Sequence, residues 1–274
     1  MGTPEFQESQ KIMHNKITSK KLIINADDFG WDDDSCKATI ECMEAGSITS
    51  ATIMTGRPAT DIACEYAAAN SHRFSFGLHL NIVDHHKPLS ENPTSLVDST
   101  TAAFRMSDQQ RIRALFWQLN SFDLQNELKA QLEVLKRKGV KVSHIDSHGH
   151  LHKFPCVITA LKNSLDQSNI KCVRRPQNLY GTGSKIKTKI INRTSSLFFK
   201  SLILTDYFLT ISSYKDAWFS NLLTLLPNGI TELAVHPGHT EKWRNEEVQP
   251  LLDKKFPFLL EKNGIQLTNF NNII

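Results

Sequence analysis

The sequence predicts an α/β fold in one domain, with a parallel sheet that is either open or closed into a barrel. Short aliphatic or β-branched runs alternate with longer amphipathic segments along the chain, which is the order of strands and helices around a parallel sheet. The 274 residues suit one domain, because α/β barrels commonly take about 200–250 residues. We expect the domain to occupy residues 20–274, preceded at 1–19 by a vector-derived remnant or flexible N-terminus.

The first half of the chain contains four strand-like runs separated by helical segments. Strands are predicted over Lys21–Ala26, Ile48–Met54, Phe74–Leu80 and Val140–Ile145. Helices are predicted from an N-cap at Ser35 to Ala45, and over Asp61–Ala69, Asp108–Leu119 and Phe122–Lys138. The aperiodic stretch from Asn81 to Ser107, about 27 residues, exceeds ordinary connections and predicts a functional loop or lid. Its histidines, His85 and His86, are expected to be exposed to solvent.

The second half continues the alternation with shorter elements. A helix is predicted over Pro155–Gln167, followed by a strand at Ile170–Val173. Residues 177–205 include a basic stretch that we interpret as a solvated helix face. The series is completed by a strand at Tyr207–Ile211, a helix at Trp218–Leu226 and a strand at Glu232–His236.

Composition and charge exclude several classes of protein. Apolar residues make up 40% and charged residues 22%, and the formal net charge is only +4, so neither a nucleic-acid-binding protein nor a disordered chain is indicated. No apolar run reaches the roughly 18 residues of a membrane span. The five cysteines form no C-x-x-C pair and favour the reducing cytoplasm over a disulfide framework. The chain also lacks a nucleotide-binding glycine loop and a G-x-S-x-G nucleophile motif.

Acidic and imidazole side chains gather where four of the strand-like runs end. The four clusters are Asp27-Asp28, His79, Asp146–His152 and His236–His239. In parallel α/β folds, ligands bind at the carboxyl ends of the strands, where the loops converge. The four clusters together therefore predict an active site at that end of the sheet.

Taken alone, each cluster also has a structural interpretation. Adjacent carboxylates on an extended chain point in opposite directions, so one of Asp27 and Asp28 could bind metal while the other accepts a proton. The pair also has the chemistry of a turn. His79, between leucines, could be a core histidine, and His236 could be held at a tight turn by the following Pro and Gly. Arg174 could bind a charged or hydroxyl-rich ligand, or could be a surface cation.

The third cluster is the most distinctive of the four. Its ionisable residues are spaced by two, so on an extended chain they would share one face: Asp146, His148, His150 and His152. Imidazole is the commonest metal-binding side chain, and a nearby carboxylate can fix its tautomer. A polar edge strand is the alternative interpretation. The spacing differs from the H-E-x-x-H of zinc protease helices, which argues against a metalloprotease.

The four clusters together resemble the YdjC-like carbohydrate deacetylase family. The strings that carry the resemblance are Asn25–Gly30 (NADDFG), Gly77–Leu80 (GLHL), Asp146–His152 (DSHGHLH) and His236–Gly238 (HPG). The first and third strings are specific, and the resemblance extends from about Lys20 to the vicinity of Asn269. It implies a single-domain β/α barrel, irregular or incomplete, related to the NodB-type polysaccharide deacetylases. The implied activity is removal of an N-acetyl group from an amino sugar or oligosaccharide, such as a chitooligosaccharide, by metal-activated water, releasing acetate.

The resemblance also implies a role for each residue that matches a family motif. Asp28, His79 and His148 would bind one divalent metal ion. Asp27 would be the catalytic base and His236 the general acid.

Three further residues are expected to bind substrate. Arg174 falls where family members often carry a substrate-contacting arginine. His150 and His152 are expected to line the pocket or to orient the metal ligands. Residues 177–230 carry no diagnostic motif of the family.

The sequence and the resemblance do not select one metal ion or one substrate. Two imidazoles and a carboxylate suit Zn²⁺, whereas the family is often described with Mg²⁺, so both ions are kept. The expected partner is an acetylated amino-sugar or oligosaccharide substrate, and the resemblance makes a homodimer plausible. Two alternative functions stay open: a metal-dependent phosphoesterase, which would more often use two ions, and a non-catalytic sugar- or metal-binding protein.

Overall fold

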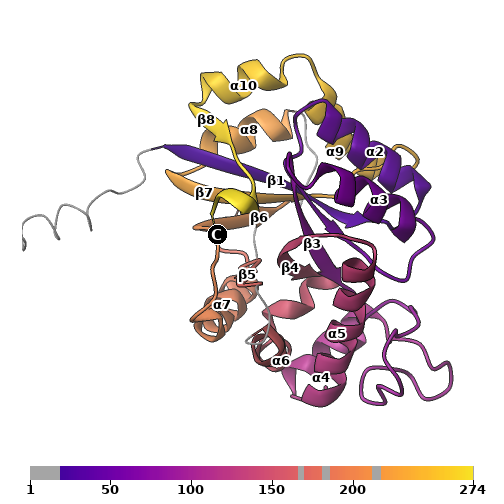
Figure 1. Ribbon diagram of the computed structural model, residues 1–274. Coiled ribbons are helices and arrows are strands. Elements are labelled where there is room, and N and C mark those ends of the chain that lie inside the picture. The colour runs from indigo at the N-terminus through magenta and orange to yellow at the C-terminus, as the bar shows by residue number, and fades with distance from the viewer. Residues whose placement is uncertain (1–18, 166–169, 181–185, 212–216, 274) are drawn as a thin grey trace, which may run out of the picture.

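The computed structural model describes residues 19–165, 170–180, 186–211 and 217–273. Its strands pair in parallel in one sheet of eight (Figure 1). They are β1 (Lys20–Phe29), β2 (Ser50–Ile53), β3 (Ser75–Leu80), β4 (Val142–Ser147), β5 (Cys172–Val173), β6 (Tyr207–Thr210), β7 (Gly229–Val235) and β8 (Ile265–Leu267). The seven strands predicted from the sequence are all present, and β8 is an addition.

Helices cover the outer face of the curled sheet. The α-helices are α2 (Asp33–Glu44), α3 (Thr60–Asn70), α4 (Ser107–Leu115), α5 (Ser121–Arg137), α6 (Pro155–Leu165), α7 (Ile186–Ser195), α8 (Trp218–Leu225), α9 (Lys242–Leu252) and α10 (Phe256–Lys262). Short 3₁₀ helices are η1 (His148–Lys153), η2 (Ser196–Phe199) and η3 (Phe270–Asn272). In Figure 1, α8, α9 and α10 lie on one side of the sheet, while α4, α6 and α7 lie on the other. No helix in the described ranges is long and apolar enough to cross a membrane.

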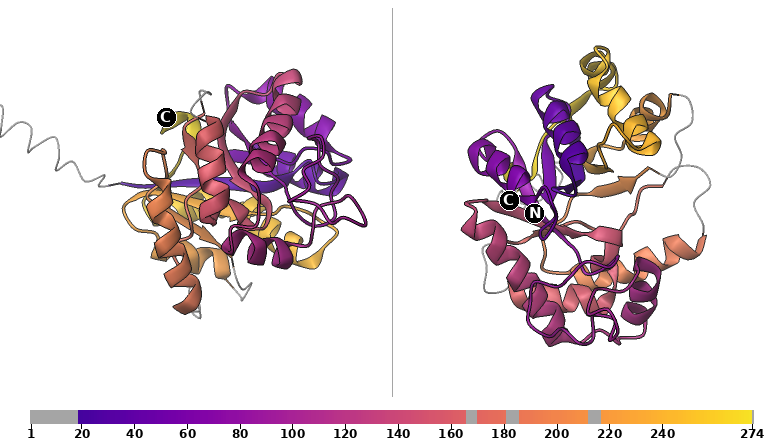
Figure 2. Two further views of the ribbon diagram at one scale, coloured as in Figure 1. Left: turned by 90° about the horizontal axis from the view of Figure 1, so that it is seen from below. Right: turned by 90° about the vertical axis from the view of Figure 1, so that its right-hand side faces the viewer.

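The sheet curls but does not close, which confirms the prediction of an incomplete barrel. The strand order is β5-β4-β3-β2-β1-β7-β6, with β8 paired to the start of β1. No ladder joins the two end strands, β5 and β6, within the described residues. At this opening the backbone N–H groups of Asn178 and Leu179 donate to the carbonyl oxygen of Phe208 in β6 instead. Helices surround the curled sheet on the outside (Figure 2).

The inward-facing residues of β1 change from apolar to polar along the strand. At its start, Ile23 packs with Cys172 and Phe270 in a small buried cluster. Two residues further along, Asn25 bonds through its amide to His144 and Thr52. Because side chains of a strand alternate between faces, Asp27 follows on the same side. An apolar plug thus closes one end of the barrel, and polar groups fill the end where the strands stop.

The boundaries of several elements differ from the sequence prediction. The N-cap of helix α2 is Asp32, not Ser35 as predicted. Ser35 is the third residue of the helix, and its side chain forms a reciprocal capping box with Asp32. Strand β1 continues through both aspartates to Phe29, and α4 ends at Leu115. The predicted N-terminal remnant, apart from Ser19, and the end of the predicted helix at 166–167 lie outside the described residues.

The long stretch after β3 is packed against α5. The Glu127 carboxylate, buried on α5, accepts hydrogen bonds from the backbone N–H groups of Leu89 and Ser90 and from the Ser90 hydroxyl. The Gln110 amide of α4 donates to the carbonyl oxygens of Ile82 and Leu96. These bonds hold the stretch in one conformation beside the carboxyl ends of the strands.

Candidate active site

The two carboxylates at the end of β1 reach the same region but have different partners. Asp28 has a φ of 59°, a left-handed conformation that is uncommon for a residue with a side chain. This local twist breaks the alternation of the strand, so that both Asp27 and Asp28 lie near His79. The regular strand geometry used in the sequence prediction would have sent them to opposite faces. A non-glycine residue held in this conformation costs about 1–3 kcal/mol, and such residues concentrate at functional sites.

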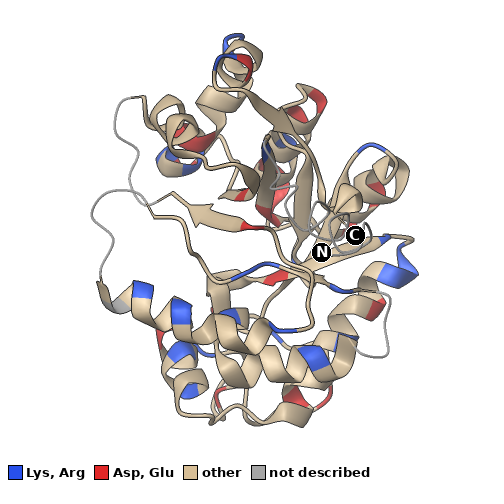
Figure 3. Ribbon diagram, turned by 90° about the vertical axis from the view of Figure 1, so that its left-hand side faces the viewer, with Lys and Arg blue, Asp and Glu red and all other residues tan. Residues whose placement is uncertain are grey.

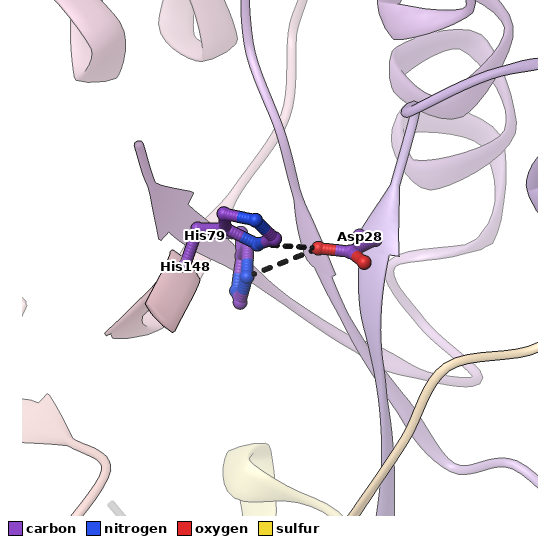
Figure 4. Close-up of side chains that lie close together, drawn as sticks. All are labelled: Asp28, His79 and His148. Carbon is purple, nitrogen blue, oxygen red and sulfur yellow. Dashed lines mark hydrogen bonds and ion pairs between the residues drawn. The ribbon is translucent and has the colours of Figure 1, made fainter. Parts of the chain in front are cut away.

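Asp28, His79 and His148 form a compact group that could hold a metal ion (Figure 4). The Asp28 Oδ1 atom lies 2.9 Å from His148 Nδ1 and 3.3 Å from His79 Nε2. The residues come from β1, β3 and the start of η1. The other carboxylate oxygen, Oδ2, accepts a hydrogen bond of 2.8 Å from Arg244. Only one oxygen of Asp28 is therefore directed at the two imidazoles.

The ring of His79 is oriented from behind by a buried carboxylate. Asp146 Oδ1 lies 2.7 Å from His79 Nδ1, which leaves Nε2 to face Asp28. Asp146 Oδ2 accepts a hydrogen bond from Thr52 and forms an ion pair of 2.7 Å with Arg174. Burial lowers the pKa of His79, but Asp146 and Asp28 outweigh it and raise the pKa to about 10. A carboxylate behind a metal-binding histidine is the usual arrangement in metal sites.

A second group of possible metal ligands consists of Asp27, His79 and Asp146. The Arg174 guanidinium already lies within 2.7 Å of both of these carboxylates, so a metal ion there would face its positive charge. We therefore take Asp28, His79 and His148 as the better metal site.

Arg174 lies beneath the site and has no exposed surface. Its guanidinium donates two hydrogen bonds of 2.6 Å to the Asp27 carboxylate and one of 2.7 Å to Glu232. Burial raises the pKa of Asp27, but the Arg174 charge outweighs it and keeps the pKa well below the usual range. The sequence predicts substrate contact for Arg174. Its position does not fit that role, because three buried carboxylates, including Asp146, surround its charged end.

His236 faces Asp27 from the end of β7. Its Nε2 lies 3.9 Å from Asp27 Oδ2, and its Nδ1 lies 3.5 Å from Glu247 Oε2. The backbone N–H of His236 also donates to Glu247. Burial lowers the pKa of His236, but the Glu247 carboxylate outweighs it and raises the pKa. The arrangement favours the protonated form of the imidazole, which lies close to the ionised Asp27.

The histidine segment is not extended, so the prediction of one shared face is wrong. Gly149 and His150 have φ angles of 62° and 55°, and the chain turns directly after His148. His152 is buried, with its Nδ1 2.7 Å from the Ser147 hydroxyl. His150 and His152 line a small hollow of about 30 Å³, together with Lys153, Arg175, Pro176, Gln177, Thr188, Asn192 and Phe208. They lie beside the site, and His148 alone of the three enters it.

Two residues at the mouth of the site were not anticipated. Asp84 Oδ2, from the long stretch after β3, lies 3.4 Å from His148 Nε2, and its carboxylate is held by the backbone N–H and hydroxyl of Ser107. Trp31 packs beside His148 with ring centroids 5.6 Å apart, and the Arg57 guanidinium lies 3.9 Å above the Trp31 ring. The predicted functional loop therefore reaches the site through Asp84.

The two loop histidines have different surroundings. His85 is exposed, as predicted. The prediction of exposure is wrong for His86, which is partly buried with its Nδ1 2.9 Å from Arg57. Burial, with the Arg57 charge, lowers the pKa of His86 to about 4.

Helix α9 supplies two further site residues that sequence reasoning missed, Arg244 and Glu247. They belong to the buried face of α9 together with Val248 and Leu251. Glu247, Val248 and Leu251 follow Arg244 by three, four and seven residues, which is the spacing of one helix face. This spacing could have indicated their burial from the sequence, because a charged residue within a buried helix face needs a buried partner. Glu232, in β7, is likewise a charged residue within a buried strand.

Known proteins resemble this chain in sequence and in fold. The family model described as YdjC-like protein matches residues 21–262. A carbohydrate deacetylase of Clostridium beijerinckii is 28% identical over 264 residues, covering 92% of this chain and 100% of that protein. One of Brevibacillus brevis is 26% identical over 263 residues, covering 92% and 99%. A solved structure from Enterococcus faecalis, provisionally described as a cellobiose-phosphate cleavage protein, shares the fold with a TM-score of 0.74 at 23% identity, covering 93% of this chain and 99% of that one. The chain belongs to the YdjC-like protein family.

Proposed function

We propose that this protein is a carbohydrate deacetylase that hydrolyses the N-acetyl group of an acetylated amino sugar or oligosaccharide. The observation that carries the proposal is the pairing of a three-residue metal site with Asp27 and His236, which lie 3.9 Å apart. A protein that only binds metal has no use for a carboxylate and a protonated imidazole beside the ion. The relatives that are named carbohydrate deacetylases match this chain over nearly their full length.

The three ligands fit one divalent metal ion. Their closest atoms are 2.9 and 3.3 Å apart, close to the spacing of roughly 3.0–3.4 Å between neighbouring ligands that lie about 2.1 Å from one ion. When bound, the ion would lower the pKa of a water ligand and polarise the acetamide carbonyl. Two imidazoles and a carboxylate favour Zn²⁺ on softness, while Mg²⁺ prefers oxygen ligands. The choice between them is left to experiment.

Asp27 is placed to accept the proton of the attacking water. The Arg174 guanidinium binds both of its oxygens at 2.6 Å and keeps the carboxylate ionised. The base is therefore in its accepting form throughout the neutral pH range, and its two bonds to Arg174 fix its orientation. In this mechanism Arg174 is a positioning residue that acts through Asp27.

His236 is placed to donate a proton to the departing nitrogen of the sugar. Glu247 stabilises the imidazolium form and raises the pKa of His236, which favours the form of the imidazole that can donate a proton. Proton donation turns the amide nitrogen into an amine leaving group. The products are acetate and a free amino sugar.

His150 is a candidate for contact with a sugar hydroxyl. Its Nδ1 is buried without a hydrogen-bond partner among the described residues, and the hollow that it lines is large enough for a single hydroxyl or water. We propose the same role for His152. Its Nδ1 is already bonded to the Ser147 hydroxyl, so only its other ring nitrogen is available to a sugar hydroxyl.

An acetate-release screen tests the proposal. The substrates are N-acetylglucosamine, its β-1,4-linked oligomers and related N-acetylated amino sugars, each with protein that is metal-free or loaded with Zn²⁺ or Mg²⁺. We expect release that depends on metal and is retained by His85→Ala, an exposed histidine outside the site. Metal binding without acetate release from any substrate would favour a binding protein. Hydrolysis of phosphate esters by a protein with two bound ions would favour a phosphoesterase.

We also propose that the protein forms a homodimer through the region where α4 meets α5. Five large apolar side chains are exposed there within eleven positions: Ile112, Leu115, Phe116, Trp117 and Phe122. A contiguous apolar surface of this kind is typical of a protein–protein contact. Light scattering coupled to size-exclusion chromatography should give a dimer for the wild type and a monomer for Phe116→Ser/Trp117→Ser. A monomeric wild type would contradict this proposal.

The five free, buried cysteines also support our proposal of a cytoplasmic location, since the fold uses no disulfide among them.

A further inference from the structure

Helix α7 exposes two isoleucines to solvent, while two of its uncharged polar side chains are buried. Ile186 and Ile190 are 76% and 58% exposed, and Leu197, just after the helix, is 64% exposed. Asn192 and Ser195 are only 3% and 4% exposed. A surface helix of a globular protein normally has the reverse arrangement, with its apolar stripe against the core.

Hydrogen bonds fix α7 in this orientation. The Asn192 amide donates a hydrogen bond of 3.1 Å to the carbonyl oxygen of Gln177 and one of 2.9 Å to the Tyr180 hydroxyl. With 3.6 residues per turn, Ile186 and Ile190 stand one turn apart on one face. The outward apolar stripe is therefore a fixed feature of the fold.

Positive charge surrounds this stripe, and negative charge is missing from the same part of the chain. Residues 167–205 contain no Asp or Glu, and their Lys and Arg residues are Lys171, Arg174, Arg175, Lys185, Lys187, Lys189, Arg193 and Lys200. In the described part of the chain, Lys189, Arg193 and Lys200 are exposed and take part in no ion pair with a carboxylate. Figure 3 shows basic residues, and no acidic ones, along this helix. The sequence prediction of a solvated basic face therefore misses the aliphatic half of the surface.

A hollow of about 280 Å³ lies between α7 and the segment that leaves β5. Its cationic lining residues are Arg175, Lys189 and Arg193, and no carboxylate lines it within the described residues. The Oδ1 atom of Asn192 and the Nε atom of Arg175 are buried there without a hydrogen-bond partner. The hollow is large enough for a phosphate group and supplies both cations and polar atoms to bind it.

We propose that α7 docks on an anionic phospholipid surface. Ile186, Ile190 and Leu197 would enter the boundary between headgroups and acyl chains, which is where the apolar face of an amphipathic helix lies on a membrane. Lys189 and Arg193 would bind headgroup phosphates. The docked protein stays outside the bilayer core, and the proposal does not depend on the deacetylase activity.

The charge distribution favours a lipid surface over a second copy of the chain. In a symmetric dimer through α7 the same patch would meet itself, so the basic side chains of the two copies would repel one another. Nucleic acid would use the cations but would leave the isoleucines and Leu197 in water. An anionic membrane accommodates both features at once.

Co-sedimentation with lipid vesicles tests the proposal on the full chain. The vesicles contain either phosphatidylcholine alone or one part phosphatidylglycerol to two parts phosphatidylcholine. We expect binding to the second kind only, and loss of binding at about 0.5 M salt, where the screening length falls to a few ångströms. Lys189→Gln/Arg193→Gln should weaken binding on the order of 25-fold, about fivefold for each cation. Ile186→Ser/Ile190→Ser should weaken it by at least as much.

Two matched variants keep the test specific. Lys136→Gln/Arg137→Gln removes two exposed cations from α5, and Leu225→Ser removes an exposed leucine from α8. Both should bind vesicles like the wild type, and all four variants should keep the wild-type melting temperature. Absence of binding to the anionic vesicles, or equal binding to both kinds, would overturn the proposal. A change of oligomeric state in the α7 variants, with vesicle binding unchanged, would assign the stripe to a second copy instead.

Discussion

Replacing Glu232 by glutamine should change the pH dependence of stability in a direction set by its burial. Its Oε1 accepts a 2.7 Å hydrogen bond from Arg174, whereas its Oε2 is buried without a partner among the described residues. Burial raises the pKa of Glu232 from 4.5 to about 7, against the attraction of Arg174. The folded protein therefore retains a proton on this group that the unfolded chain has already lost.

The sign of the effect follows from this difference. A carboxyl group whose pKa is raised by folding contributes fully to stability below its unfolded pKa, and the contribution is lost as the pH rises through the folded pKa. Raising the pKa from 4.5 to about 7 corresponds to a loss on the order of 3 kcal/mol above pH 7, at about 1.4 kcal/mol per pH unit. The Glu232→Gln variant keeps the bond to Arg174 but has no proton to lose. Its free energy of unfolding should exceed that of the wild type by about 1 kcal/mol at pH 5 and by about 3 kcal/mol at pH 8.

Urea unfolding of metal-free protein at pH 5, 6, 7 and 8 measures this difference. The exposed Glu65, changed to glutamine, is the matched control and should leave the pH dependence unaltered. A Glu232→Gln variant that is less stable than the wild type at pH 8 would refute the reasoning, because the carboxylate would then be a favourable ionised partner of Arg174.

The remaining predictions concern the metal site and the acid. His148→Ala should lose metal binding, measured by calorimetry, together with acetate release, while its melting temperature without metal stays near that of wild type. Arg244→Met should raise the metal dissociation constant by about 10–100-fold, because Asp28 loses the partner that orients it; an unchanged constant would exclude this role. Glu247→Gln should move the alkaline limb of the pH–rate profile to lower pH, because the carboxylate that raises the pKa of His236 is removed. A limb that stays in place would show that another group sets it.

The proximity of the three proposed metal ligands could be predicted from the sequence because each follows a short apolar run, whereas their role as ligands was implied by the family resemblance. Asp28 and His79 lie at the ends of β1 and β3, and His148 follows β4 directly. Parallel strands end at one edge of the sheet, so the position of these residues in the strand pattern already brings them together in space. The parallel sheet followed from the alternation of strands and helices, and the incomplete barrel from the family resemblance.

The surroundings of Arg174 could not be predicted in this way. Its carboxylate partners come from β1, β4 and β7, and a charged residue directly after a short strand has no local feature that distinguishes a buried position from an exposed one. The turn at His150 has a clearer local cause. The preceding Gly149 adopts a positive φ without steric cost, so the chain can leave the extended conformation there.

The roles of Asp84 and Arg244 depend on tertiary contacts that no pattern along the chain records. Asp84 belongs to an aperiodic stretch that α5 holds in place, and Arg244 reaches Asp28 across 216 residues of sequence. A histidine or carboxylate at a strand end is visible in the sequence. Groups from distant parts of the chain that orient it, such as Asp84 and Arg244, could be identified only from the structure.

In the proposed mechanism Asp27 accepts the proton of the attacking water beside one metal ion that it does not bind. Acetate release from an N-acetylated amino-sugar oligomer should therefore be compared between wild type and Asp27→Asn, each shown by metal analysis to hold one ion per chain. We predict that the variant keeps its ion and loses about 10²–10⁴-fold in turnover. Turnover by Asp27→Asn at the wild-type rate, with the ion bound, would contradict the account.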